Sequence, residues 1–317
     1  MPRILITRAM PDRVLERART LGEVIVEDTP EGVSPDAARE ALAAYDIIVP
    51  TLGDRFTAEA FAGGDDPRCK LLANFGMGYN HIDIAAARDA GIAVTNTPGA
   101  VTDATADVAL MLMLMACRRA SEGEAMVRAG RWPGWQPTQL LGLHMTGKRL
   151  GVIGMGNIGQ AVARRAHYGF GMEVLYHNRS AKQVDFPAQQ VADLHEMLGQ
   201  VDVAVVAVPA SPATRHLIDA AALAAIQPHA RLVNIARGDI VDETALIAAL
   251  QEGRLGGAGL DVYEHEPEVP QALRDMPNVS LLPHLGTSAL EVREAMGAVA
   301  LDNVEAHLAG RDLPNAV

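Results

Sequence analysis

The stretch Val152-Ile153-Gly154-Met155-Gly156-Asn157-Ile158-Gly159 has the glycine spacing G-x-G-x-x-G. On its own this spacing is weak evidence, because the chain contains 29 glycines. Its context is stronger: we expect a strand over residues 149–153, a helix over residues 158–168, and a second strand that ends about 18 residues after Gly159. This unit is typical of dinucleotide-binding domains, and the alternative is a glycine-rich structural turn.

Each glycine of the motif has a physical role if a dinucleotide binds there. Gly154 would make the tight turn, Gly156 would let the backbone approach the pyrophosphate, and Gly159 would let the helix pack on the strand. The helix N-terminus adds unpaired N–H groups and a partial positive charge. The predicted cofactor-binding residues of this turn are Gly154, Met155, Gly156, Asn157, Ile158 and Gly159.

The second strand of the unit ends in His177-Asn178-Arg179-Ser180. An acidic residue here would bond the adenosine ribose 2′-hydroxyl and repel a 2′-phosphate, but none is present. Asn178, Arg179 and Ser180 offer donors instead, and arginine pairs well with phosphate. We therefore expect the segment from His177 to Ser180 to bind the cofactor, and NADP(H) to be favoured over NAD(H). The alternative is that Arg179 is a solvated loop residue, in an enzyme that uses both cofactors or prefers NAD(H).

Working outward from the motif, strand-like and helix-like segments alternate along almost the whole chain. Before the motif we expect strands over residues 4–7, 23–26, 46–49 and 71–74, with helices over 12–20 and 35–44. From residue 149 onward we expect strands over 150–153, 173–176, 203–206, 231–235, 257–260 and 279–282. Most are rich in Val, Ile and Leu without alternation, as in parallel strands covered on both faces. The fold class is therefore α/β, with doubly wound parallel sheets.

Two further segments predict helices beside domain crossings. Residues 102–129 predict one helix that is long enough to bridge two domains. Ser288 and Glu291 form a capping-box pattern, with Ser288 as the expected N-cap of a helix that runs to about residue 308. The turns at residues 96–99 and 283–287 precede these helices, and we expect the chain to cross between domains there.

Composition excludes several classes of protein. The 317 residues suggest two domains. The net charge of −12, from 27 basic and 39 acidic residues, argues against nucleic acid or an anionic membrane as a partner. The only cysteines are Cys69 and Cys117, so we expect neither a disulfide framework nor a Cys-rich metal site. The N-terminus is typical of a strand rather than a signal peptide, and the longest apolar run, residues 108–117, is too short to span a bilayer. We expect a cytoplasmic protein.

Three ionisable residues in the second half, Arg237, Glu266 and His284, each follow an expected strand. Because ligands bind beyond the carboxyl ends of parallel strands, the three side chains can converge. Imidazole suits a proton donor near neutral pH, a carboxylate orients the ring, and a guanidinium binds carboxylate bidentately. Singly, each has an ordinary structural interpretation: a satisfied histidine, a turn arginine or a loop carboxylate. Together they suit the reduction of a 2-keto acid, which needs a proton donor and a carboxylate clamp.

The chain resembles the D-2-hydroxyacid dehydrogenase family over essentially its whole length, and within it most the glyoxylate and hydroxypyruvate reductases. The resemblance is carried by Asn74-Phe75-Gly76-Met77-Gly78-Tyr79-Asn80-His81-Ile82-Asp83, the glycine motif, Val208-Pro209, Thr214-Arg215-His216-Leu217-Ile218, and the segments around Arg237, Glu266 and His284. It implies a Rossmann cofactor domain, residues 99–284, inserted into a discontinuous flavodoxin-like substrate domain, residues 1–98 and 285–317. It also implies hydride transfer from nicotinamide C4 to a short 2-keto acid, giving the D-2-hydroxy acid, with His284 as proton donor, in a homodimer.

The resemblance implies roles for further residues. In the turn Gly76-Met77-Gly78, the N–H groups of Met77 and Gly78 bind the substrate carboxylate as an anion nest, with a purely structural turn as the alternative. Leu52 lines the same pocket, and Asp261 holds the nicotinamide carboxamide. Trp135 lies at the dimer interface and reaches the partner's active site, with packing inside one subunit as the alternative. The other expected cofactor-binding residues are Thr105, Val208, Pro209, Thr214, Ile235, Ala236, Arg237, His284 and Gly286, and Arg237 and His284 are also expected to contact the substrate.

Other functions fit parts of the sequence. Formate dehydrogenases of this fold pair their histidine with Gln, whereas Glu266 stands here. Phosphite dehydrogenase keeps the Arg, Glu and His set, so a small anion such as phosphite is an alternative substrate. A non-enzymatic corepressor that senses dinucleotide is the alternative from another class, but such proteins usually carry long low-complexity tails, which this sequence lacks.

Overall fold

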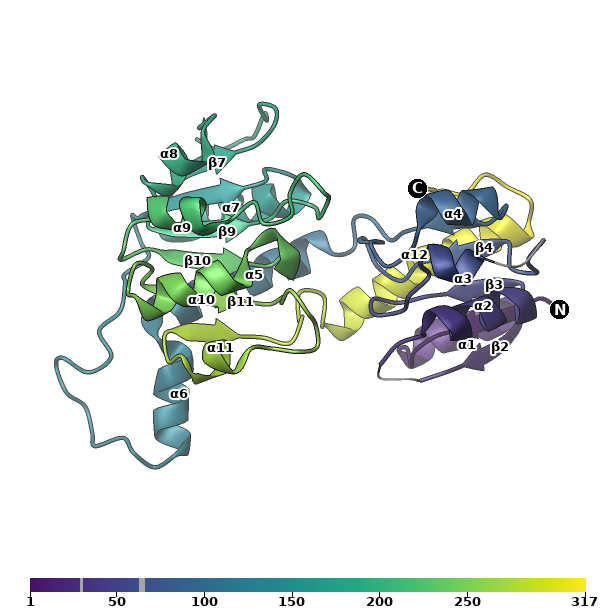
Figure 1. Cartoon of the computed structure of the whole chain (residues 1–317), viewed down its shortest axis with the longest axis horizontal. Helices are drawn as coiled ribbons and strands as arrows, with labels where there is room; N and C mark the ends of the chain where they lie inside the picture. Colours follow the sequence, from purple (N-terminus) through teal and green to yellow (C-terminus); the bar gives the residue numbers. More distant parts are fainter. Residues whose placement is uncertain (29–30, 63–65) are drawn as a thin grey trace. The chain divides into compact units, whose positions relative to one another are not determined.

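The computed structural model describes residues 1–28, 31–62 and 66–317 (Figure 1). The chain forms two compact units: the first contains Met1–Val101 and Ser288–Val317, and the second contains Thr102–Thr287. The first unit is therefore built from both ends of the chain, and the second is one continuous insertion. Both divisions fall three residues after the expected bounds, which were 98/99 and 284/285.

The first unit contains a five-stranded parallel sheet with the order β2-β1-β3-β4-β5. Its elements are β1 (Arg3–Ile6), α1 (Asp12–Leu21), β2 (Glu23–Val26), α2 (Pro35–Ala44), β3 (Ile47–Val49), α3 (Ala58–Phe61), β4 (Leu71–Ala73), α4 (Ile84–Asp89), β5 (Ala93–Thr95) and α12 (Leu290–Leu308). All residues of β3 and β4 are buried, as expected for central parallel strands. Helix α12 packs against α1 and β4 (Figure 1). The strand order is that of flavodoxin-like folds.

The second unit contains a seven-stranded parallel sheet with the order β12-β11-β10-β9-β6-β7-β8. Its strands are β6 (Arg149–Ile153), β7 (Glu173–His177), β8 (Gln189–Gln190), β9 (Val203–Val206), β10 (Arg231–Asn234), β11 (Gly257–Leu260) and β12 (Val279–Leu281). Its helices are α5 (Thr102–Arg118), α6 (Ala120–Arg128), α7 (Asn157–Phe170), α8 (Leu194–Leu198), α9 (Ala220–Ala225), η1 (Gly238–Ile240), α10 (Glu243–Gln251) and α11 (Gln271–Asp275).

Helices cover both faces of the larger sheet, which explains its apolar strands. Leu112 of α5 and Val162 of α7 pack in one core with Val152 of β6. Leu246 of α10 packs in a second core with Leu232 of β10. The order of the strands reverses between β6 and β9, and ligands bind beyond the carboxyl ends of parallel strands at such a switch point.

The ten expected strands and the α/β class are confirmed, and two details of the helices are wrong. The expected helix over residues 102–129 is two helices, because Arg119 adopts a left-handed backbone with φ +53°. The last carbonyls of α5 are instead bonded by Arg231 Nε, 3.0 Å from Ala116 O, and by Leu143 N, 2.7 Å from Cys117 O. Sequence periodicity does not reveal such long-range partners.

The expected capping box at the start of α12 is also wrong. The helix begins at Leu290 with Ala289 as its N-cap, and no side chain caps it. Ser288 Oγ instead accepts a hydrogen bond from Arg293 Nη2 at 3.3 Å. Two short strands, β5 and β8, were not expected, because two or three residues carry too little periodicity to be recognised. Across residues 1–28, 31–62 and 66–317, no helix combines the length and apolar character that a membrane crossing requires.

Candidate active site

The glycine turn after β6 is too crowded for side chains at two of its three glycines. Gly154 has φ +99°, and a Cβ there would lie 2.8 Å from the backbone of Ala207. A Cβ on Gly159 would lie 2.1 Å from the carbonyl oxygen of Gly154, so this glycine lets α7 approach the turn. A Cβ on Gly156 would meet no atom within 4 Å. The first and third glycines are thus explained by packing, and the second leaves open space beside the turn.

The start of α7 has the features of an anion site. Its N-cap is Gly156, which provides no side-chain cap, and the first N–H groups of a helix have no partner within the helix. Asn178 ties the end of β7 to this turn: its Oδ1 accepts from Met155 N at 3.2 Å, and its Nδ2 donates to Ser180 O at 2.8 Å. The exposed Arg179 makes no hydrogen bond or ion pair with any residue that the structure describes. Open space, an uncapped helix and an unengaged cation fit the phosphates of a dinucleotide.

The other expected cofactor residues belong to the second unit, where Thr105 lies in α5, His177 lies in β7 and the rest lie in loops. Val208 and Pro209 follow β9, and Thr214 Oγ1 donates to Pro209 O at 2.8 Å, which closes this loop. His177 ends β7, and its Nδ1 lies 3.3 Å from Val191 O. A Cβ on Gly286 would lie 3.5 Å from the Thr105 side chain, so these two residues are neighbours.

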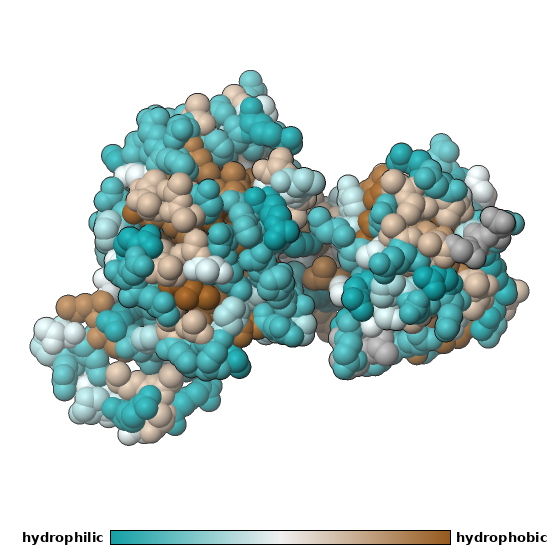
Figure 2. Space-filling view, viewed as in Figure 1, coloured by the Kyte–Doolittle hydropathy of each residue, from teal (hydrophilic) through white to brown (hydrophobic). Residues whose placement is uncertain are grey.

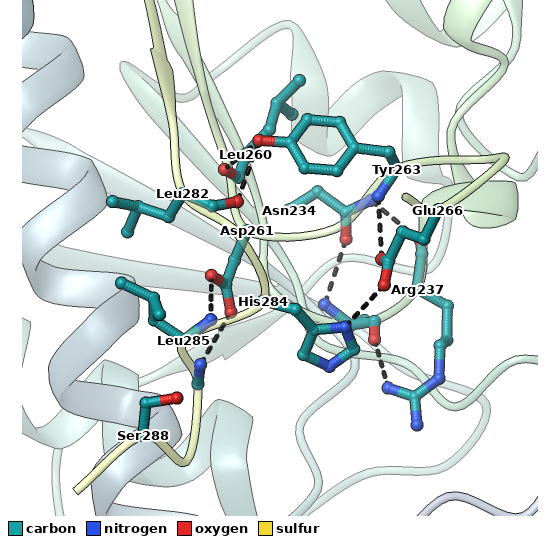
Figure 3. Close-up of polar contacts among 12 residues, drawn as sticks. Asn234, Arg237, Leu260, Asp261, Tyr263, Glu266, Leu282, His284, Leu285 and Ser288 are labelled. Atoms are coloured by element: carbon teal, nitrogen blue, oxygen red, sulfur yellow. Dashed lines mark hydrogen bonds and ion pairs between the residues drawn. The ribbon is translucent and has the colours of Figure 1, made fainter. Parts of the chain in front are cut away.

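His284 and Glu266 form a hydrogen-bonded pair (Figure 3). His284 Nδ1 lies 2.9 Å from Glu266 Oε2, and Glu266 Oε1 accepts from Tyr263 N at 3.0 Å. Partial burial alone would raise the pKa of Glu266, but the hydrogen bond and charge of His284, the Tyr263 N–H and the charge of Arg237 lower it below its usual value. The carboxylate therefore stays ionised at neutral pH and faces the imidazole as a negative partner.

The backbone of His284 is left-handed, with φ +55°, which few non-glycine residues adopt. Asp261 holds it there. The backbone carbonyl of Asp261 accepts from His284 N at 2.9 Å, and its carboxylate accepts from Leu285 N at 2.6 Å and from Gly286 N at 2.8 Å. Asp261 is 1% exposed, and burial raises its pKa despite these two donors. The sequence placed Asp261 near the site but gave no indication of this anchoring role.

Tyr263 and Asn234 also shape the site, and sequence reasoning missed both. The Tyr263 hydroxyl donates to Leu282 O at 2.9 Å and to Leu260 O at 3.3 Å, so it ties together the ends of β11 and β12 (Figure 3). Asn234 Nδ2 donates to Arg237 O at 2.8 Å, and its Oδ1 accepts from Ala236 N at 3.1 Å. A polar amide directly after the apolar pair Leu232 and Val233 of a buried strand was the only signal for Asn234.

Arg237 lies in the turn that follows β10, after the expected cofactor residues Ile235 and Ala236. Its Nη1 donates to Ala236 O at 2.7 Å, and Figure 3 shows its guanidinium on the same side of the loop as the His284 ring. Burial lowers the pKa of Arg237, against the charges of Glu266 and Asp239, but a guanidinium remains charged at neutral pH. A Cβ on Gly238 would lie 1.8 Å from the backbone of Tyr263. The loop that carries Arg237 therefore packs directly against the loop that carries Glu266.

In the first unit, the carbonyls of the turn Gly76-Met77-Gly78 are all tied inward. Asn74 Nδ2 donates to Gly76 O at 2.9 Å and to Gly78 O at 3.0 Å, and Asn96 Nδ2 donates to Met77 O at 2.9 Å. Thr97 N also donates to Gly76 O, at 3.1 Å. Within the described part of the chain, no hydrogen-bond acceptor faces the N–H groups of residues 77 and 78. Two adjacent unpaired donors are what an anion nest requires.

Leu52 and Trp135, the expected substrate-binding residues outside the glycine turns and the Arg–Glu–His set, are both exposed. Leu52 follows β3 in the first unit and has 41% of its surface accessible. Trp135 belongs to the second unit and is 81% exposed, so the alternative that it packs inside one subunit is wrong. Among the described residues, no three His, Cys, Asp or Glu side chains are grouped to hold a metal ion.

A parallel-sheet dinucleotide fold with a His–Glu pair and an arginine at its strand ends defines a dinucleotide-dependent oxidoreductase. Residues 110–286 match the family model described as D-isomer specific 2-hydroxyacid dehydrogenase, NAD binding domain. The chain belongs to the D-2-hydroxyacid dehydrogenase family.

Similar proteins cover the whole chain. It is 39% identical over 322 residues to the glyoxylate reductase of Thermococcus onnurineus, covering 100% of this chain and 96% of that protein. It is 35% identical over 319 residues to the glycerate dehydrogenase of Hyphomicrobium methylovorum, covering 99% and 98% of the two chains. The solved NADPH-dependent glyoxylate/hydroxypyruvate reductase of Sinorhizobium meliloti, in complex with NADP and malonate, has 34% identity and a TM-score of 0.88, covering 100% and 96%.

Proposed function

We propose that this enzyme reduces a short 2-keto acid, such as glyoxylate or hydroxypyruvate, to the D-2-hydroxy acid with NAD(P)H. The observation that carries the proposal is the His284–Glu266 pair, at 2.9 Å, beside the Arg237 guanidinium. These groups follow β10, β11 and β12 of the same sheet that carries the glycine turn. The names of the relatives, glyoxylate reductase and glycerate dehydrogenase, support the same substrate class.

In this mechanism His284 is the proton donor. With Nδ1 bonded to Glu266, the imidazolium presents Nε2–H, which has no partner in the described part of the chain. This proton passes to the carbonyl oxygen of the substrate as the bound cofactor supplies the hydride. Glu266 positions the ring and stabilises its positive charge, because its lowered pKa keeps it ionised.

Arg237 acts on the other end of the same substrate. Its guanidinium binds the carboxylate and polarises the adjacent carbonyl, because its five donors form a fork that matches planar oxygen pairs. The anchored left-handed turn at His284 and the packing of Gly238 on Tyr263 fix the proton donor and the clamp relative to each other. Preorganised donors of this kind contribute most when they do not have to move during the reaction.

The second unit would hold the cofactor, and each unit carries groups that suit the substrate. The open space at Gly156, the N–H groups of α7 and the loop of Val208 and Pro209 suit the pyrophosphate. Each carboxylate oxygen of Asp261 accepts one backbone hydrogen bond and keeps a second lone pair, which would accept a hydrogen bond from the carboxamide of the nicotinamide. In the first unit, the N–H groups of Met77 and Gly78 suit an anionic group, and the exposed Leu52 would contact the substrate.

The experiment that tests this function is a spectrophotometric assay of a keto-acid panel with NADPH and with NADH. We expect turnover of glyoxylate or hydroxypyruvate, and a higher kcat/KM with NADPH because Arg179 is exposed, unengaged and next to the ribose position. Absence of turnover with every keto acid would contradict the function and would leave phosphite oxidation or corepressor activity to be tested. A clear preference for NADH would contradict only the cofactor assignment.

We also propose that the enzyme is a homodimer formed through the second unit. Met111 and Leu114 are exposed on α5, where they line a hollow of about 670 Å³. Trp132, Trp135 and Leu141 are exposed on the loop that follows α6, and Figure 2 shows apolar atoms on this projecting loop. Large apolar side chains left exposed in this number suit an interaction site. Sedimentation equilibrium should give about twice the chain mass of 33.6 kDa, and a monomer would contradict the proposal.

A further inference from the structure

Arg293 is a half-buried cation without a negative partner. It lies in the second turn of α12, and its Cζ is 5.9 Å from the centre of the Phe75 ring. The only hydrogen bond of its side chain within the described residues goes from Nη2 to Ser288 Oγ, at 3.3 Å. Burial lowers the pKa of Arg293, and no neighbouring carboxylate offsets this shift. Most donors of the guanidinium therefore remain available.

Other arginines that contact α12 do have carboxylate partners. Arg13 lies 3.3 Å from Glu294, and Arg17 lies 2.7 Å from Asp302 and 3.1 Å from Glu305. The chain holds 39 acidic residues and only 27 basic ones, so a carboxylate partner would be easy to supply. A partly buried charge that is left unpaired costs stability. Retaining Arg293 without a partner is therefore explained if a ligand supplies the missing acceptor.

The position of Arg293 indicates which ligand. Phe75, which its guanidinium faces, immediately precedes the turn Gly76-Met77-Gly78. The carbonyls of this turn are bonded inward, and the N–H groups of Met77 and Gly78 have no partner among the residues that the structure describes. Thus one edge of the first unit carries both an anion nest and an unpaired cation. The nest has two donors for a carboxylate, and Arg293 offers donors for a second oxygen-bearing group.

We propose that Arg293 is a specificity-determining residue that binds an oxygen substituent on C3 of the substrate. The proposal rests on the function given above and narrows it: the favoured substrates are 2-keto acids whose C3 either carries a hydroxyl group or is itself a carboxylate carbon. Hydroxypyruvate and ketomalonate have such an oxygen, whereas glyoxylate has no C3 and pyruvate has a methyl group. The Arg293 guanidinium therefore gains a charge-assisted hydrogen bond to a C3 oxygen with hydroxypyruvate and ketomalonate, but not with glyoxylate or pyruvate.

The test compares Arg293→Met with Arg293→Lys. Methionine keeps an unbranched stem over Phe75 but removes the charge and donors, while lysine keeps the charge. We expect Arg293→Met to lower kcat/KM for hydroxypyruvate or ketomalonate about tenfold or more, mainly through KM, and to change glyoxylate and pyruvate less than about threefold. Arg293→Lys should recover part of the loss. Arg13→Met removes the same charge beside Glu294 of the same helix and should leave the substrate preference unchanged.

A binding measurement separates failure of this inference from failure of the proposed function. If wild type reduces no keto acid, the function fails, but calorimetry of D-glycerate and glycolate binding in the presence of NADP⁺ still tests Arg293. Tighter binding of D-glycerate that is lost in Arg293→Met supports the inference. An equal loss of kcat/KM for all four keto acids, or a D-glycerate preference that persists in the variant, would overturn it. Comparing hydroxypyruvate with ketomalonate distinguishes a hydroxyl from a carboxylate as the favoured group.

Discussion

Replacing His284 with Asn should lower kcat for keto-acid reduction by about 10³-fold, because the variant has no proton to give to the carbonyl oxygen. Asn is the informative substitution: His284 has φ +55°, and asparagine also tolerates the left-handed region. The backbone hydrogen bond from residue 284 to Asp261 O, at 2.9 Å, is then kept. Steady-state kinetics with NADPH measures the effect, and thermal unfolding should show a change in Tm of only a few degrees.

Two further variants separate proton donation from general damage to the fold. His229 lies 2.7 Å from Asp202, a matched His–carboxylate pair before β10 at the opposite edge of the same sheet, so His229→Asn should retain nearly full activity. Glu266→Gln keeps a hydrogen-bond acceptor for His284 but removes the negative charge of the carboxylate. In the wild type, the lowered pKa of Glu266 keeps this charge at neutral pH. The positive charge of the imidazolium is then less stabilised, so kcat should fall while Tm stays close to that of wild type. If His284→Asn stays within tenfold of wild type, His284 is not the proton donor.

The parts of the fold that could be predicted from the sequence are those encoded locally. Buried parallel strands are short apolar runs, so β9 and β11 were expected with their observed bounds. The glycine at position 159 could be anticipated because its close approach to the carbonyl oxygen of Gly154 lies within a single turn of chain, whereas the crowding at Gly154 comes from Ala207 on a distant loop. The break at Arg119 could not, because the hydrogen bond that ends α5 comes from Arg231, 115 residues away from its acceptor in the sequence.

In the candidate site, too, the locally encoded features could be predicted and the long-range contacts could not. Parallel strands end at one edge, so Arg237, Glu266 and His284 were expected to converge, and the structure brings Glu266 to His284. The supporting contacts depend on loop conformations that no short pattern encodes. Asp261 bonds N–H groups 24 and 25 residues further along the chain, and Tyr263 bonds a carbonyl 19 residues away. The reactive groups were therefore recognisable by chemical type, whereas the residues that hold them were recognisable only in three dimensions.

Replacing Arg237 with Ala should lower kcat/KM for the keto acid by about 10³-fold, with a smaller loss of about 10²-fold for Arg237→Lys. A guanidinium that both binds the carboxylate and polarises the carbonyl acts in the ground state and in the transition state, so KM should rise and kcat should fall together. Lysine keeps the positive charge beside Glu266 but loses the bidentate geometry. A pure binding role would instead raise KM and leave kcat unchanged, which would contradict the polarising role.

Arg254 provides the matched control for Arg237. Its Nε lies 2.6 Å from Glu252, and it precedes β11 at the amino edge of the sheet, whereas Arg237 follows β10 at the carboxyl edge. Arg254→Ala removes the same charge from the same unit, and an exposed ion pair contributes little, so kinetics and Tm should stay close to those of wild type. The net charge of −12 makes this comparison necessary, because the loss of any cation strengthens the long-range repulsion of an anionic substrate. Only a loss specific to Arg237, and insensitive to added salt, identifies a direct contact with the substrate, since salt screens the long-range effect.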